Sequence, residues 1–385
     1  MAVKRYIASA DTTITNAYSS NIMEGSRATG SNMGEADVME IFSIYDQGPP
    51  GQVDSGPDGL DPSSGSVELS RALINFPVTN IITDRTNGDI PASGSVNFYL
   101  RLFNAKHAFT LPREYKLVVH AVSQSWEEGT GLDMEEYKDK TLEQEGANWV
   151  FAGKGTKWDT EKVGDVGGSY RSDYSQAVSF GRGNEDLETD ITQLVEKWII
   201  NNDFDNYGVG VYLSASYEGY FSSSTGQTTG SHIHNIDGAK RSYYTKKFFA
   251  RGSEFYFKRP LIEARWDSSI KDDRANFYFS SSLASGDDNL NTLYFYNYVR
   301  GQLKDIPALE KNKGNTFRVS LYSGSNPDNT IPSSGDPKLE LSKGGNVANA
   351  KDFYATAGHT GKTGIYSASI ALTSSTSIPQ ITKLF

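Results

Sequence analysis

The chain has 385 residues, no cysteine and a formal net charge of −10. These values exclude disulfides and thiolate chemistry, and they disfavour a nucleic-acid binder, which needs clustered Lys and Arg. No stretch reaches the roughly 18 apolar residues of a membrane span, and residues 1–7 lack the apolar core of a signal peptide.

Short alternating segments rich in aromatic and β-branched residues predict a mainly β protein. The first set of predicted strands covers Lys4–Ser9, Asp37–Tyr45, Val67–Phe76, Val96–Phe103, Tyr115–Val122, Tyr207–Leu213 and Arg259–Trp266. One short helix is predicted over Asp186–Ile200, because its apolar residues recur at helical spacing, and Val78–Ile82 is interpreted as a short link. We expect a jelly-roll β-sandwich over residues 1–266, sealed by the amphipathic part of this helix up to Trp198.

A polar stretch after Trp266 predicts a boundary and a second, Ig-like β-sandwich domain over residues 267–385. Its predicted strands are Ala275–Ser280, Asn291–Tyr298, Thr316–Tyr322 and Gly364–Leu372. The β-like sequence continues to Phe385, so we expect this domain to be incomplete at its C-terminus, with a strand partner beyond it or on another chain.

The segment 125–168 is loop-like but holds three tryptophans, which argues for order. Trp126, Trp149 and Trp158, with Glu127 and Asn148, are candidates for a glycan platform, in which rings stack on sugars and polar groups bind hydroxyls. The alternative is that the rings plug one end of the sandwich. Glu127 and Glu128 also allow a glycosidase, although adjacent residues do not define a pair across a cleft.

Three patterns suggest metal or phosphate binding. Asp11, Asn32 and Asp37 lie in oxygen-rich segments that suit a structural calcium ion, the one cofactor considered. His232 and His234, two residues apart, could hold a metal, but no third ligand accompanies them. The segment Gly358–Thr363 ends like a phosphate-binding loop; however, Thr356 replaces the first glycine and a strand pattern follows, so we interpret it as a turn.

Several pieces, in order, resemble the DNRLRE-type jelly-roll domain, a relative of carbohydrate-binding modules. They are Ala10–Ile14, Leu69–Phe76, Val96–Leu102, Val122–Gly129, Asp190–Trp198 with Tyr207–Val211, Arg251–Glu254 and Arg259–Glu263. The sequence departs from that family after Trp126-Glu127-Glu128, where Leu132–Tyr137 replaces the usual Thr-Trp-Asn.

The chain as a whole is similar to structural proteins of T-even-like marine tailed phages, through Lys4–Tyr18 and Ser125–Tyr137. This resemblance implies a non-enzymatic virion component of the neck, tail or head surface. Its partners would be other copies and other virion proteins, and we expect large, dry interfaces on residues 267–385. The alternative is a carbohydrate-binding surface protein that contacts host glycans.

Overall fold

A computed structural model describes residues 2–17, 28–46, 66–107, 111–132, 145–159, 167–200, 204–220, 235–239, 242–268, 270, 272–275, 277–311, 313–322, 338–342 and 351–372. The chain forms two compact units, residues 1–268 and 269–385, and each is considered by itself. His232, His234 and the strand-like C-terminal tail lie outside the described residues.

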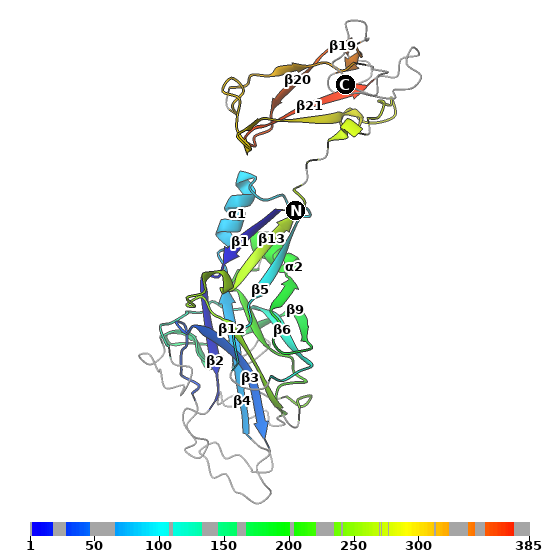
Figure 1. Ribbon diagram of the computed structural model, residues 1–385. Coiled ribbons are helices and arrows are strands. Elements are labelled where there is room, and N and C mark those ends of the chain that lie inside the picture. Colours follow the sequence, from blue (N-terminus) through cyan, green and yellow to red (C-terminus); the bar gives the residue numbers. More distant parts are fainter. Residues whose placement is uncertain are drawn as a thin grey trace, which may run out of the picture. The chain divides into compact units, whose positions relative to one another are not determined.

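The first unit is built mainly from antiparallel strands (Figure 1). Its described strands are β1 (Ala2–Ile7), β2 (Ala10–Thr15), β3 (Val38–Asp46), β4 (Ser66–Asn75), β5 (Val96–Leu102), β6 (Tyr115–Val122), β7 (Phe151–Gly153), β8 (Thr156–Lys157), β9 (Tyr170–Phe180), β10 (Leu187–Asp190), β11 (Val209–Leu213), β12 (Ser242–Phe249) and β13 (Leu261–Trp266).

In the described part of this unit, two sheets share one core, as in a β-sandwich. One has four strands in the order β1-β13-β5-β10. The other has seven, in the order β12-β3-β4-β11-β6-β9, with β2 also paired to β4. Along β5 the side chains of Val96, Phe98 and Leu100 are buried while Asn97 is exposed, the alternation that a half-buried strand requires. The predicted mainly β fold is confirmed.

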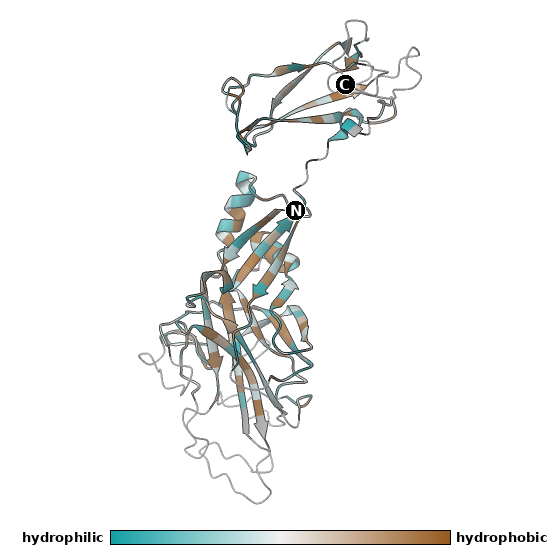
Figure 2. Ribbon diagram, in the orientation of Figure 1, coloured by the Kyte–Doolittle hydropathy of each residue, from teal (hydrophilic) through white to brown (hydrophobic). Residues whose placement is uncertain are grey.

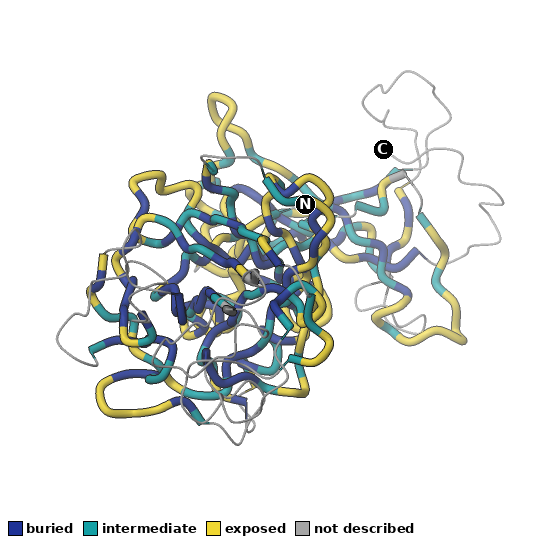
Figure 3. Tube along the Cα trace, turned by 90° about the horizontal axis from the view of Figure 1, so that it is seen from below, coloured by how far each residue is buried: buried dark blue, intermediate teal, exposed yellow. Residues whose placement is uncertain are grey.

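The seven-stranded sheet is buried on both faces along β4. Ala72 and Ile74 belong to the large core between the sheets, whereas Leu69 and Leu73 belong to a second cluster on the opposite face. Successive side chains of a strand point to opposite faces, so one strand serves both clusters. In Figure 3 the buried stretches of this unit run through its interior, with exposed turns around them.

Two α-helices are described, rather than the single predicted one. Helix α1 (Val78–Asn87) follows Pro77 and ends at Gly88, whose φ of 79° suits glycine. The prediction of a link at Val78–Ile82 is therefore wrong. Val78 and Ile81 have the i, i+3 spacing of one helical face, and both are buried. Figure 2 shows hydrophobic and hydrophilic stretches along it.

Helix α2 (Thr192–Ile200) is shorter than predicted. Leu187–Asp190 forms β10 instead, paired with β5, and the Asp190 carboxylate accepts a hydrogen bond from the backbone N–H of Thr192 at 2.8 Å. This bond satisfies one of the free N–H groups at the start of the helix. Leu194, Val195 and Trp198 are buried in the large core, so the predicted seal of the sandwich is confirmed.

The second unit is also antiparallel β. Its described strands are β14 (Asn291–Tyr296), β15 (Tyr298–Val299), β16 (Gln302–Leu303), β17 (Phe317–Val319), β18 (Leu341–Ser342), β19 (Lys351–Asp352), β20 (Ala355–His359) and β21 (Ile365–Leu372). Ala275–Ser280 is predicted as a strand, but its described residues form an isolated bridge, from Phe279 to Leu372, in place of a strand. The segment Gly358–Thr363 joins two paired antiparallel strands, as its interpretation as a turn requires.

Candidate functional site

The rings of Trp149 and Trp158 face the protein interior. They are 0% and 3% exposed and belong to the cluster that covers the outer face of β4. The indole Nε1 of Trp158 donates to the carbonyl oxygen of Asn148 at 2.8 Å. The half-buried Trp126 donates from its Nε1 to the carbonyl oxygen of Tyr207 at 2.8 Å. The structure brings the three predicted rings together, but as packing for the sheet rather than as open stacking faces.

The polar residues of the predicted glycan platform hold the same loop in shape. Asn148 is buried, and its Oδ1 accepts hydrogen bonds from the backbone N–H groups of Val150 and Phe151, both at 2.9 Å. The exposed Glu127 accepts a bond from the backbone N–H of Lys154 at 3.1 Å. These contacts fix the turn at Asn148–Phe151 and join Glu127 to Lys154.

Asn32, one of the three calcium candidates, has its amide fully occupied. Its Oδ1 accepts from the backbone N–H groups of Gly34 and Gly131 at 3.1 and 2.9 Å. Its Nδ2 donates to the carbonyl oxygens of Glu128 and Ala147 at 2.8 and 2.9 Å. An amide oxygen has two lone pairs, so both are used by the chain itself.

Asp11 and Asp37 converge on the segment Ala250–Arg251. The carboxylate of Asp11 accepts from the backbone N–H of Arg251 at 2.6 Å, and the carbonyl of the exposed Asp37 accepts from Ala250. The Arg251 guanidinium binds both oxygens of Glu128 at 2.9 and 2.7 Å. The cation in this neighbourhood is thus the chain's own arginine. Within the described ranges, no group of three His, Asp or Glu residues could hold a metal ion.

Burial makes the carboxyl group of Asp11 a weaker acid than usual. Its side chain is almost entirely covered, and desolvation raises the pKa of its carboxyl to about 7, against the lowering effect of the Arg251 N–H bond. The sequence offers Asp11 as a candidate calcium ligand; in the structure its carboxylate accepts a hydrogen bond from the backbone N–H of Arg251.

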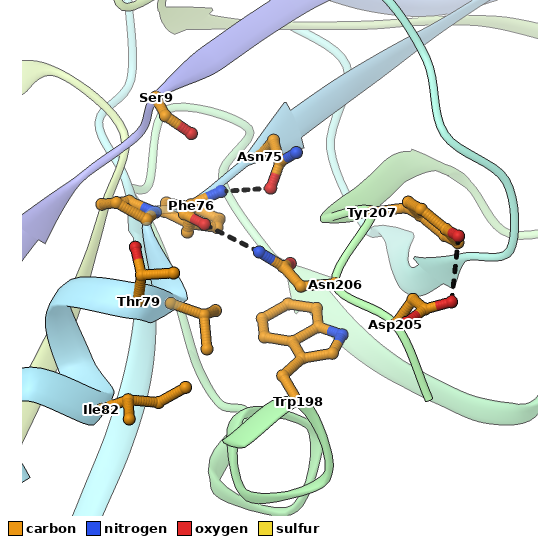
Figure 4. A pocket seen from close by; sticks show the side chains of 11 residues that line it. Ser9, Asn75, Phe76, Thr79, Ile82, Trp198, Asp205, Asn206 and Tyr207 are labelled. Carbon is orange, nitrogen blue, oxygen red and sulfur yellow. Dashed lines mark hydrogen bonds between the residues drawn. The ribbon is translucent and has the colours of Figure 1, made fainter. Parts of the chain in front are cut away.

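A pocket of about 450 Å³ opens where β4 passes into α1 and α2 packs alongside (Figure 4). Its walls combine apolar side chains with hydroxyl, amide and carboxylate groups, and they come from separate parts of the chain. The lining residues are Ser9, Asn75, Phe76, Pro77, Val78, Thr79, Ile82, Trp198, Asp205, Asn206 and Tyr207.

Hydrogen bonds fix one wall of the pocket, which is formed by Asp205–Tyr207, after α2 in the chain. The Nδ2 of Asn206 donates to the carbonyl oxygen of Phe76 at 2.8 Å, and its Oδ1 accepts from Gly208. The Tyr207 hydroxyl donates to Asp205 Oδ2 at 3.0 Å. These bonds tie Asp205–Tyr207 to the end of β4 and set the shape of the pocket.

Sequence reasoning missed this pocket because it missed α1, which supplies Val78, Thr79 and Ile82. The signal was present: Pro77 precedes the segment and Gly88 follows it, the pattern of a helix start and stop.

No family model matches this chain. No curated protein matches it either. Across the described ranges, neither α-helix is long and apolar enough to cross a membrane.

Proposed function

We propose that this chain is a non-enzymatic building block of a tailed-phage virion, and that its second unit contacts other copies or other virion proteins. The resemblance to phage structural proteins implies this role, and the jelly-roll connectivity of the first unit is part of the same proposal. Support comes from candidate platform and calcium residues whose polar side-chain atoms bond to backbone groups of the chain itself, such as Trp126, Trp158, Asn148 and Asn32.

The observation that carries the proposal is the amount of apolar surface that the second unit exposes around a small core. Leu283 is 97% exposed, and Tyr296 and Tyr298 are stacked with ring centroids 6.4 Å apart. Exposed large apolar residues of this unit are Tyr278, Phe279, Leu283, Tyr296, Tyr298, Val299 and Phe353. Exposed aromatic side chains such as the stacked Tyr296 and Tyr298 are typical of protein–protein contact surfaces.

Sedimentation velocity on the full chain over a concentration series tests the contact. We expect reversible self-association that Tyr298→Ser weakens about tenfold, because burying an aromatic side chain contributes about 1.5–3 kcal/mol. Tyr243→Ser is the matched control: Tyr243 is also exposed, stacked on Tyr244 and located on β12 in the first unit.

Two outcomes contradict self-association through the second unit. A chain that stays monomeric at every concentration has no self-contact. An association lost with Phe257→Ser, which removes an exposed ring of the first unit, but retained with Tyr298→Ser, assigns the contact to the first unit.

Mass spectrometry of purified particles tests the virion role directly. We expect peptides of this chain at a stoichiometry of several copies per particle. Their absence from particles that contain the other structural proteins would remove the proposed location.

A further inference from the structure

We propose that the edge of β9 that faces away from β6 pairs with β9 of a second copy, so that two seven-stranded sheets join across a two-fold axis. This contact lies in the first unit, and it does not rest on the second-unit contact proposed above. Three features carry it: the uncovered position of β9 in the sheet, the direction of its backbone groups, and the charges along it.

Strand β9 is one end of the seven-stranded sheet, beside β6 (Figure 1). It is 11 residues long, and most of its residues between Ser172 and Ser179 are exposed. An edge strand presents a row of unpaired N–H and C=O groups, which proteins normally cover, shorten or charge to prevent pairing with another chain. A long edge without such protection is a place where a strand of another chain can add to the sheet.

The opposite end of the same sheet, β12, is covered by another segment of the chain. The backbone N–H of Phe249 donates to the carbonyl oxygen of Phe103 at 3.0 Å. The carbonyl oxygen of Lys247 accepts from the N–H of Ala105 at 3.0 Å. For residues 175–180 of β9, the described ranges contain no backbone hydrogen bond outside the ladder with β6. The sheet therefore has one covered end and one open end.

The ladder fixes which backbone groups of β9 point outward. The carbonyl oxygen of Lys116 on β6 accepts from Ser214, on the β11 side, at 3.0 Å. Lys116 lies opposite Ser179 of β9. Hydrogen-bonded and non-hydrogen-bonded pairs alternate along an antiparallel ladder, so this pair is a non-hydrogen-bonded one, and the groups of Ser179 point away from β6. The same holds for every second residue, which adds Ala177 and Ser175.

The open edge also lacks the side chains that keep edge strands apart. Residues 174–180 contain no charged residue and no proline, whereas β1, at the edge of the other sheet, carries Lys4 and Arg5. Charged side chains, above all lysine, and proline are the usual protection of an edge. The three outward positions hold only serine and alanine, so a second strand can approach to the normal spacing of about 4.8 Å.

The partner that fits is a second β9, because this edge is complementary to itself. With the two-fold axis at Ala177, that residue lies opposite its own counterpart, and Ser175 lies opposite Ser179 of the second copy. All three outward positions then form hydrogen-bonded pairs of an antiparallel ladder. Such a contact uses the same surface on both copies and closes as a dimer.

The charges beyond the centre agree with this register. Asp173 lies opposite Gly181 of the second copy and therefore beside its Arg182. Arg182 is exposed, and its guanidinium has no carboxylate partner in the described part of the chain. Asp173 binds Arg171 of its own chain at 2.9 Å, so the second arginine adds to an existing pair. Like charges do not lie opposite each other at any of these positions.

Crosslinking of the full chain tests the register, because the sequence has no cysteine of its own. Ala177→Cys should give a covalent dimer on mild oxidation, since the Cα atoms of a hydrogen-bonded pair are about 5.5 Å apart, within reach of a disulfide. Ser175→Cys is the matched control on the same strand. The proposed register separates its two Cα atoms by about 14 Å, so we expect no covalent dimer. Intact mass under non-reducing conditions measures both.

Sedimentation velocity of Ala177→Lys and Ala177→Gln tests the two-fold axis. The two new side chains are similar in length, but Ala177→Lys places like charges opposite each other at the axis. We expect its dimer to be about threefold to fivefold weaker than that of Ala177→Gln, and the difference to shrink at high salt. Both variants are made in the Tyr298→Ser background, so that the second-unit contact does not contribute to the readout.

Failure of this proposal can be told apart from failure of the second-unit contact. A crosslink at Ala177→Cys that persists together with Tyr298→Ser supports the β9 contact, whether or not the second unit associates. A crosslink that disappears with Tyr298→Ser overturns it, as does the absence of a crosslink at Ala177→Cys. Equal crosslinking of Ala177→Cys and Ser175→Cys, or equal association of Ala177→Lys and Ala177→Gln, overturns it as well.

Discussion

The Nη2 atom of Arg71 lies 3.3 Å from both carboxylate oxygens of Glu218, and both side chains are buried. Arg71 is on β4 and Glu218 follows β11, so the ion pair joins these neighbouring strands. The guanidinium also donates to the carbonyl oxygen of Gly167 at 3.1 Å and lies over the ring of Tyr212 at 4.2 Å. One buried cation thus ties the tryptophan loop to the seven-stranded sheet.

Glu218→Gln should destabilise the first unit by about 3–5 kcal/mol, because it leaves the Arg71 charge buried without its counter-ion. Urea unfolding followed by tryptophan fluorescence measures the change. Glu188→Gln is the control, since Glu188 pairs with Arg265 in a more exposed position and should cost about 0–1 kcal/mol. Equal effects of the two variants would contradict a stabilising role for the buried pair.

Asp11→Asn should remove a pH dependence of stability. Burial raises the pKa of Asp11 from 3.8 to about 7. The folded chain therefore holds a proton between about pH 4 and 7 that the unfolded chain has released. The free energy of unfolding should fall as pH rises through that window, by an amount on the order of 2–4 kcal/mol.

The measurement is urea unfolding at pH 5 and pH 8 for the wild type and Asp11→Asn. The difference between the two proteins isolates Asp11 from groups whose pKa is lowered in the folded state, such as Asp84, Glu188 and Glu263. A wild type that loses no more stability than Asp11→Asn between these pH values would show that Asp11 titrates normally.

Glu196→Gln should loosen the contact between the two helices beside the pocket. Arg85 donates from Nη1 and Nη2 to the two oxygens of Glu196 at 2.8 and 2.6 Å, and both side chains are mostly buried. We expect a loss of about 1–2 kcal/mol, the scale of a charge-assisted bond. The amide protons of α1 should exchange faster with solvent. Asp89→Asn, at the exposed end of the same region, should leave that exchange unchanged.

Trp149→Ala should cost about 3–5 kcal/mol of folding free energy, because it empties a large volume in a packed cluster. Leu132→Ala is the control on the same loop, at a side chain that is largely exposed. A small loss at Trp149, within the range of Leu132→Ala, would mean that the ring is dispensable for packing and would reopen its role in stacking on a ligand.

The strands of the first unit were predictable where the residues alternate cleanly. β6 occupies the predicted range Tyr115–Val122, and β5 ends one residue earlier than expected. β9 was missed because most of its residues between Arg171 and Val178 are exposed or half-buried polar side chains, so no apolar period marks it. Its strand character comes from pairing with β6, which is a tertiary effect.

The candidate site residues were less predictable for a similar reason. The sequence singles out Trp149 and Asn32, but the type of residue does not reveal whether a polar atom faces a ligand or a backbone group. The side-chain amide of Asn32 forms hydrogen bonds with backbone groups nearly a hundred residues or more away in the sequence, at Glu128, Gly131 and Ala147. Such partners are assigned only when the loops meet in space.

β4 supplies side chains to the clusters on both of its faces. We therefore expect the two clusters to unfold together. Heating should therefore give residues 2–268 a single calorimetric endotherm, even though their interior is divided by a sheet. A mutation at Leu73 should lower the temperature of that endotherm without splitting it.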